Sequence, residues 1–198
     1  MEMVYILKKV IFVSKNKDLN MIIYEKKLCY EAKKILLEPN AGGTSEYTEA
    51  YAMQILFENF NAKYIYTEMN IKYYNEWWKK CDFITTINNE NIGVSVTRAI
   101  FTNKYNPDDL DYQISNLLYK KLSGLIIARS GVEHNIFNSS ILFIWSPNRI
   151  TSNIILYTFI YKTDFSLKKN IKLIIVETNF KNLVTNFKNI DNFNYIIY

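Results

Sequence analysis

The sequence contains few of the residues from which zinc sites, disulfide frameworks and glycine-rich loops are built. Its 198 residues include 2 cysteines, 1 histidine, 5 glycines and 3 prolines. Cys29 and Cys81 form no C-x-x-C pair, and His134 has no partner at metal-ligand spacing. Gly42 and Gly43 lack the Gly-Lys-Ser/Thr that completes a phosphate-binding loop. Any metal ion in this protein would therefore be held by oxygen atoms.

Long apolar runs are also absent. No run approaches the roughly 18 to 20 residues of a membrane span. The first thirteen residues are interrupted by Glu2, Lys8 and Lys9, so they lack the apolar centre of a signal peptide. These absences predict an intracellular, soluble protein, in the nucleus or the cytoplasm, with no membrane partner.

The composition is that of a globular chain. Apolar residues make up 49% and aromatic residues 16% of the sequence, which excludes a disordered or collagen-like chain. We expect one domain over residues 41–198, preceded by an N-terminal extension, 1–40, with short strands at 3–13 and 20–24 and a helix at 24–37. The net charge of +5 permits a nucleic-acid partner. A composition rich in Asn, Lys, Ile and Tyr explains the same charge without one.

The centre of the sequence predicts an antiparallel hairpin. Residues 81–87 and 92–98 are rich in β-branched side chains, and the polar residues 88–91 separate them. A turn centred between Asn89 and Glu90 would bring the two strands into register. The hairpin is therefore the expected centre of a sheet.

The two faces of this hairpin differ in chemistry. In the expected register Asp82 faces Thr97. Because side chains alternate across a strand, Asp82 shares a face with Ser95 and Thr97, while Val94 and Val96 point to the other face. One carboxylate and two hydroxyl groups are thus expected to meet on one side of the sheet.

Two acidic residues open the next helix upstream, which Thr44 or Ser45 is expected to cap. Their simplest explanation is that acidic side chains suit the helix dipole. A rotation of 100° per residue, however, places both on the apolar stripe of the helix, where a carboxylate needs a partner or a metal ion. The stripe comprises Glu46, Glu49, Ala50, Met53, Leu56, Phe57 and Phe60.

The remaining pattern predicts an α/β sandwich with a mixed central sheet flanked by helices. Alternation over residues 63–74 indicates a strand that completes a three-stranded meander with the hairpin, and Glu68 on it points either toward Asp82 or to solvent. A helix from Pro107 is expected to end at Lys120 and Lys121, with 124–128 continuing or bending it. Later elements are buried strands at 141–145 and 172–176, a helix at 151–161, and a tail, 180–198, that covers a sheet edge.

Four stretches, taken with this order of elements, resemble the PD-(D/E)XK, or restriction-endonuclease-like, nuclease superfamily. The resemblance covers about residues 42–177 and implies an α-β-β-β-α-β core with the active site on the meander. The stretches are GGTSEYTEA, KKCDF, GVSVTRA and LLYKKLSG.

The resemblance implies a site for Mg²⁺ or Mn²⁺. Glu49, with Glu46 as the other candidate, matches the acid on the family's first helix, and Asp82 matches the acid on its second core strand. The segment Ser95-Val96-Thr97 stands where the family has E-x-K. Serine in place of glutamate removes a charged metal ligand, and threonine in place of lysine removes the cation beside the phosphate.

Other side chains are candidates for these missing groups. A second acid, Glu68 or Glu46, would complete the set of metal ligands. Arg98 would supply positive charge if a bulge turned it, since alternation sends it to the face opposite Thr97. Lysines of the neighbouring strand and turn are the alternatives: Lys72, Lys79 and Lys80.

Two functions follow as hypotheses. The first is a Mg²⁺-dependent nuclease acting on DNA or RNA, with metal ligands among Glu46, Glu49, Glu68 and Asp82 and with Glu49, Asp82, Ser95, Thr97 and Arg98 as the catalytic set. The second is an inactive relative that binds nucleic acid or a protein through the same groove, using Tyr64, Tyr66, Trp77 and Trp78. Asp82 also has a purely structural explanation, as an acceptor of hydrogen bonds from Ser95, Thr97 or a turn amide.

Overall fold

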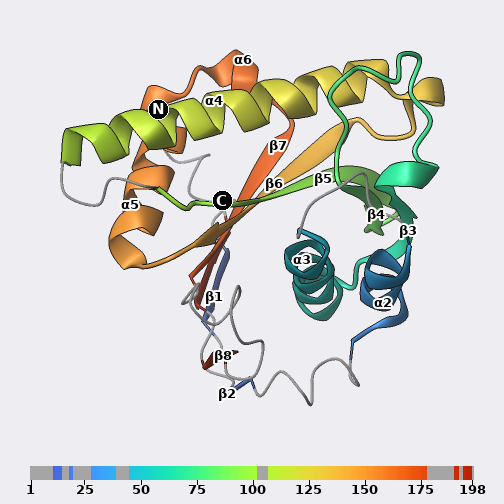
Figure 1. The fold of residues 1–198 in the computed structure, drawn as a ribbon, viewed down its shortest axis with the longest axis horizontal. Coiled ribbons are helices and arrows are strands. Elements are labelled where there is room, and N and C mark those ends of the chain that lie inside the picture. Colours follow the sequence, from blue (N-terminus) through green and yellow to red (C-terminus); the bar gives the residue numbers. More distant parts are fainter. Residues whose placement is uncertain are drawn as a thin grey trace.

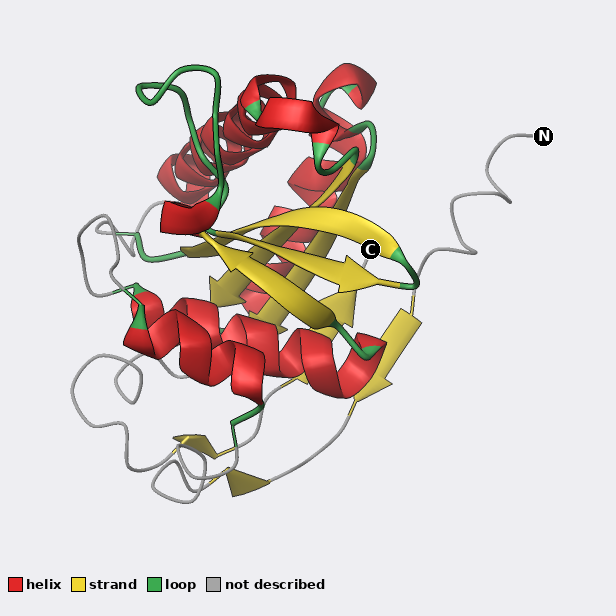
Figure 2. Ribbon diagram, turned by 90° about the vertical axis from the view of Figure 1, so that its right-hand side faces the viewer, coloured by secondary structure: helices red, strands yellow, loops and turns green. Residues whose placement is uncertain are grey.

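The structure is a computed structural model that describes residues 11–14, 18–19, 28–38, 45–101, 107–177, 190–191 and 194–197. It has a mixed sheet with helices on both faces (Figures 1 and 2). The expected α/β class with a flanked mixed sheet is therefore confirmed. Within the described ranges, no helix is long and apolar enough to cross a bilayer.

The strands and helices follow one another in nearly the expected order. The strands are β1 (Ile11–Ser14), β2 (Asp18–Leu19), β3 (Lys63–Thr67), β4 (Phe83–Ile87), β5 (Glu90–Arg98), β6 (Ser139–Ser146), β7 (Ile171–Glu177), β8 (Ile190–Asp191) and β9 (Asn194–Ile197). The α-helices are α2 (Tyr30–Leu37), α3 (Glu46–Phe60), α4 (Pro107–Gly131), α5 (Arg149–Tyr157) and α6 (Phe165–Lys168). Single turns of other helix types are η2 (Glu68–Asn70), η3 (Glu133–Asn135) and η4 (Thr158–Lys162), the last a continuation of α5.

The main sheet has the strand order β1-β9-β7-β6-β5-β4-β3. Strands β3, β4 and β5 form an antiparallel meander, and β6 and β7 continue the sheet parallel to β5. Helix α4 makes the crossover from β5 to β6, and α5 with η4 leads from β6 toward β7. Strand β9 pairs with β7, so the described part of the tail covers that edge as expected.

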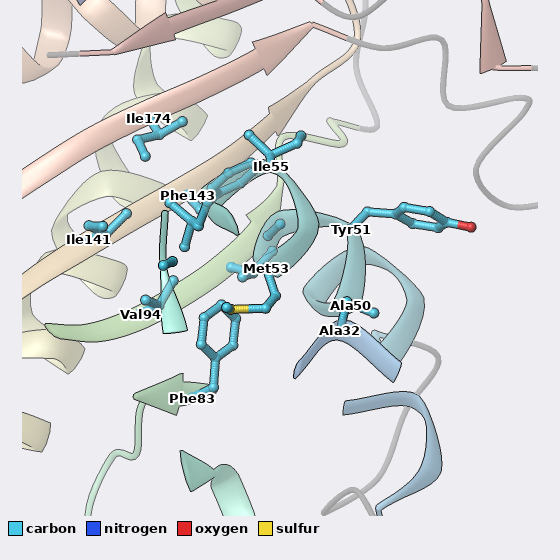
Figure 3. Packing of buried hydrophobic residues seen from close by; sticks show 14 of the residues in the cluster. Ala32, Ala50, Tyr51, Met53, Ile55, Phe83, Val94, Ile141, Phe143 and Ile174 are labelled. Atoms are coloured by element: carbon cyan, nitrogen blue, oxygen red, sulfur yellow. The ribbon is translucent and has the colours of Figure 1, made fainter. Parts of the chain in front are cut away.

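Alternate side chains of the sheet pack on two different helical layers. On one face Phe83, Val94 and Phe143 pack with Met53 of α3 (Figure 3). On the other face Leu142 and its neighbours pack beneath α4. Each layer buries the apolar side of its helix, which is the main stabilising contribution to such a fold.

Helix α3 is buried on more than the side that faces the sheet, and α2 packs beside it in the same layer (Figure 1). Every residue from Thr48 to Leu56 is buried. The apolar stripe expected from the sequence is thus only part of the buried surface, and Phe57, which was placed on that stripe, is 37% exposed. The stripe prediction was wrong for Phe57 and right for Glu49 and Met53.

The strand expected over 63–74 ends at Thr67. Its continuation is the single turn η2, and Tyr73 then forms an isolated bridge to Val132 at the end of α4. The Glu38 carboxylate accepts hydrogen bonds from the side chains of Thr67 and Asn70, which fixes the turn. The chain leaves the sheet edge here to reach α4.

Helix α4 runs past Lys120 and Lys121, where the sequence had suggested an end. Leu122, Leu125 and Ala128 continue the buried stripe of the helix. The burial of these residues outweighs the roughly 1 kcal/mol by which one interior glycine, Gly124, disfavours a helix.

The described residues of the N-terminal region join the same core. Strand β1 pairs with β9, and α2 packs against α3. Helix α2 begins at Tyr30, where the Cys29 side chain accepts a hydrogen bond from the Ala32 amide. The predicted start of this helix at 24–27 and the predicted strand at 20–24 lie outside the described residues, as do residues 3–10 of the first predicted strand.

Gly93 offers a test of this packing. It is buried on β5, and a Cβ there would lie 2.4 Å from the ring of Phe137. We expect Gly93→Ala to lower the free energy of unfolding by about 1 to 3 kcal/mol, since the ring or the strand must move. Gly124→Ala is the matched control, because the nearest atom to its added Cβ is 4.0 Å away and alanine favours a helix. If urea unfolding shows Gly93→Ala to be as stable as Gly124→Ala or more stable, this packing is contradicted.

Candidate active site

The β4–β5 hairpin sets the position of Asp82. Its turn residues Asn88 and Asn89 have φ values of 52° and 64°, the conformation of a type I′ turn. The turn is therefore centred one residue before the predicted position, and Phe83 pairs with Val94. This register places Asp82 beside Ser95, so the prediction that it faces Thr97 was wrong.

The Asp82 backbone and side chain both bind to β5. Its amide donates to the Val94 carbonyl at 2.9 Å, and its carboxylate accepts from the Val96 amide. Burial raises the pKa of this carboxyl group, while Lys121, the Val96 amide and the Ser95 hydroxyl act to lower it. Of the donors that the structural hypothesis named, Ser95 acts on this carboxylate, whereas the Val96 amide lies on the strand and was not among them. The net pKa of Asp82 stays raised.

Lys121 of α4 brings a cation to the same end of β5. Its Nζ donates to the Val96 carbonyl at 3.4 Å, beside the amide that binds Asp82. The sequence interpretation allowed that Lys120 and Lys121 contact phosphate, but it left Lys121 out of the candidate site because such a pair is more common at a solvated helix end. Its spacing is a signal that was available: Lys121, itself half-buried, stands at helical spacing among the buried residues Ile114, Leu118, Leu125 and Ala128.

Glu49 lies in the first turn of α3 and is only 8% exposed. The pKa of its carboxyl group is raised to about 7, mainly by burial and in addition by the charges of Asp82, Glu68 and Glu46. A hydrogen bond from the Ser45 side chain acts in the opposite direction. Ser45 precedes the helix as expected, but its side chain makes no capping bond to the helix backbone.

The start of α3 is fixed to the sheet. The Trp145 indole N–H of β6 donates to the Thr48 carbonyl at 3.1 Å, and the Thr48 hydroxyl donates to the Ser45 carbonyl at 2.8 Å. Trp145 itself is fully buried. Glu49, the next residue, is therefore held at a defined position relative to β5 and β6.

Glu68 begins η2 rather than lying on a strand, and it is half-buried. Burial and the charge of Asp82 raise the pKa of its carboxyl group, and Lys80 acts to lower it. Glu68, Glu49 and Asp82 thus come from three separate segments, and the charge of Asp82 raises the pKa of both glutamates. This concentration of negative charge suits a cation.

The acids do not form a closed cage. Among the described residues, no group of three His, Cys, Asp or Glu side chains is close enough together to hold a metal ion. An ion bound here would need one or two carboxylates, with hydroxyl, carbonyl, water or phosphate oxygens as its other ligands. Mg²⁺ commonly binds in this way, because it keeps several waters and uses substrate phosphates.

The other predicted site residues divide between the two faces of β5. Thr97 is half-buried and shares the face of Ser95. Arg98 shares the face of Val94 and Val96, which pack toward α3, so the sheet separates it from Lys121 as strand alternation predicted.

The remaining candidates lie around the acids. Glu46 is half-buried in the first turn of α3, and its charge raises the pKa of Glu49. Lys72 and Lys79 are exposed, whereas Lys80 approaches Glu68 closely enough to lower its pKa. Of the predicted lysines, Lys80 is thus the one that acts on the acids.

Comparison with known proteins gives one similarity and no family. The chain is 34% identical over 151 residues to the "AAC-rich mRNA clone AAC4 protein" of Dictyostelium discoideum, a match that covers 70% of this chain and 21% of that protein. The chain therefore spans about a fifth of the length of this relative. No family model matches the chain. No solved structure matches it either.

Proposed function

We propose that this protein is a Mg²⁺- or Mn²⁺-dependent nuclease of the PD-(D/E)XK type that hydrolyses phosphodiester bonds of DNA or RNA. The observation that carries the proposal is the meeting of Asp82, Glu49 and Glu68 with the cation of Lys121 at one end of β5. The order α3-β3-β4-β5-α4-β6 supports it, since this is the order expected of the superfamily core.

The donor set fits a hard divalent cation. Asp82 and Glu49 would be its charged ligands, with Glu68 as a further acid, and the hydroxyl groups of Ser95 and Thr97 lie on the Asp82 face of β5. A bound Mg²⁺ would polarise the phosphodiester and acidify the attacking water. Its positive charge would also favour the ionised form of Glu49. Burial raises the pKa values of these acids, and a bound cation would act in the opposite direction.

Lys121 would replace the lysine of the E-x-K motif, which β5 lacks. It reaches the strand from α4, beside the Val96 backbone that holds Asp82. An ammonium group there would stabilise the negative charge that develops on the attacked phosphate. This placement offsets the loss of lysine at Thr97, whereas Arg98 on the far face does not.

A lysine pair on α4 tests this role. We expect Lys121→Met to lower the rate constant of metal-dependent cleavage by about 10²- to 10³-fold, the usual effect of removing one group that stabilises the transition state. Lys120→Met is the control, because Lys120 is the adjacent residue and is exposed. Cleavage of labelled single-stranded and duplex DNA and RNA is measured with Mg²⁺, Mn²⁺ or EDTA. Equal rates for the two variants would rule out this role for Lys121.

A second candidate function is binding without catalysis. The observation that favours it is the replacement of E-x-K by Ser95-Val96-Thr97, together with the absence of a three-acid cage among the described residues. Such a protein would bind nucleic acid with a strong salt dependence and no need of metal. Wild-type protein that binds but never cleaves, with either metal, would select this function over the nuclease.

A further inference from the structure

The turn at residues 75–80, here called the tryptophan turn, presents the most exposed large apolar side chain of the described residues. Trp77 is 93% exposed. In Figure 1 the turn belongs to the green loop that rises beside the yellow end of α4. An indole held in water forgoes the burial that usually stabilises it. The Trp77 side chain is therefore accessible to another molecule.

The tryptophan turn is fixed rather than loose. The Asn75 side chain accepts from the Trp77 amide at 2.9 Å, and its carbonyl accepts from the Trp78 amide at 3.2 Å. Trp78 packs so closely on Gly131 that a Cβ there would lie 2.3 Å from its ring. The Tyr74 amide donates to the Gly131 carbonyl at 2.9 Å. Trp77 is thus held ready without the entropy cost of ordering a mobile loop.

The same segment connects Trp77 to the candidate site. Lys79 is two residues beyond Trp77 and packs beside Gly124. Gly124 lies about one helical turn beyond Lys121 on α4. Lys80 comes next, with its Nζ 5.8 Å from the centre of the Tyr73 ring. Asp82 is five residues beyond Trp77, a span of at most about 18 Å for extended chain.

We propose that Trp77 stacks on an unpaired base of single-stranded nucleic acid while Lys79 and Lys80 contact its phosphates. The inference rests on the proposed function and narrows its substrate to strands with accessible bases. An indole stacks on the face of any base, but the bases of a duplex have their faces covered. At about 3.4 Å per stacked nucleotide, the span to Asp82 covers at most about five nucleotides.

Binding without metal tests the inference separately from catalysis. Fluorescence anisotropy with the full chain in EDTA compares labelled oligothymidylate with a duplex of equal length. We expect Trp77→Ala to weaken binding of the single strand between about fivefold and a hundredfold, the usual effect of losing one stacked base, and to change duplex binding by less than twofold. Trp77→Phe keeps a ring and should restore most of the affinity.

Phe165→Ala is the matched control, since Phe165 is also highly exposed, at 74%, but lies on α6. It should bind as the wild type does. Quenching of tryptophan fluorescence by the single strand should decrease strongly in Trp77→Ala, because Trp145 is buried and Trp78, which is 43% exposed, packs part of its ring on Gly131 of α4.

Three results would overturn the inference: no binding by the wild type, equal loss of single-strand and duplex binding in Trp77→Ala, or no loss at all. If Trp77→Ala loses single-strand binding but the wild type never cleaves on addition of Mg²⁺, the stacking role stands and the nuclease proposal fails. If Trp77→Ala instead binds single strands as the wild type does and still cleaves them, the stacking role fails and the nuclease proposal stands.

Discussion

Asp82→Asn is expected to reduce metal-dependent cleavage at least a hundredfold while leaving the protein folded. Asparagine has the same shape and keeps an acceptor oxygen for the Val96 amide. It loses the negative charge that would bind the cation and that Lys121 faces. Because Asp82 costs stability when ionised and buried, its neutral replacement should not unfold the protein.

Rates with Mg²⁺ or Mn²⁺ and a thermal unfolding curve for each variant check this expectation. Glu90→Gln is the control, because Glu90 is an exposed acid at the start of the same hairpin strand. It should retain the wild-type rate. Undiminished cleavage by folded Asp82→Asn would show that the metal is bound elsewhere.

Glu49→Gln is expected to make the metal-free protein more stable at pH 8 but not at low pH. The pKa of Glu49 is about 7 in the folded protein against an ordinary value of 4.5. Folding thus favours the protonated form. The contribution of Glu49 to stability is complete below about pH 4.5, declines as the pH rises and is lost above about pH 7. Since a change of one in pKa corresponds to about 1.4 kcal/mol, the difference reaches at most about 3 kcal/mol.

Urea unfolding at pH 5 and pH 8 in EDTA measures this effect. Glutamine cannot ionise, so Glu49→Gln should gain about 1 to 3 kcal/mol over the wild type at pH 8 and little at pH 5. Glu76→Gln on the exposed tryptophan turn should change stability by less than about 0.5 kcal/mol at either pH. If Glu49→Gln is instead less stable than the wild type at pH 8, favourable contacts of the wild-type Glu49 carboxylate outweigh the cost of burying it.

Much of the fold was predictable because the decisive patterns are local. The continuous apolar runs of β6 and β7 mark strands covered on both faces. The face shared by Asp82 and Ser95 was also predictable. Moving the turn centre by one residue shifts the pairing by two, and an even shift keeps each side chain on its face.

The register itself depended on turn chemistry. Asn88 and Asn89 both adopt positive φ, a conformation that asparagine tolerates better than glutamate does. An Asn-Asn pair is therefore a better type I′ turn than Asn89 with Glu90. A turn at Asn88 and Asn89 fixes the register in which Asp82 lies beside Ser95.

The site's other members depend on contacts between distant segments. The position of Glu68 results from the link of Glu38 to Thr67 and from the bridge of Tyr73 to Val132. The alternation of polar and apolar residues over 63–74 predicts neither contact. Lys121 was left out of the predicted site for a simpler reason, since two lysines resemble the end of a helix although the buried stripe continues beyond them.

Calorimetric titration of Mn²⁺ into the metal-free protein tests the central claim, that Asp82 and Glu49 hold a divalent cation. The titration is made at pH 6 and pH 8, with thymidine 5′-monophosphate present to supply phosphate oxygens. We expect the wild type to bind Mn²⁺ more tightly at pH 8, because Glu49, with a pKa of about 7, must lose its proton. Folded Asp82→Asn should bind none at this site. The same Mn²⁺ affinity in wild type and Asp82→Asn, or no binding by the wild type, would show that Asp82 and Glu49 do not hold the cation.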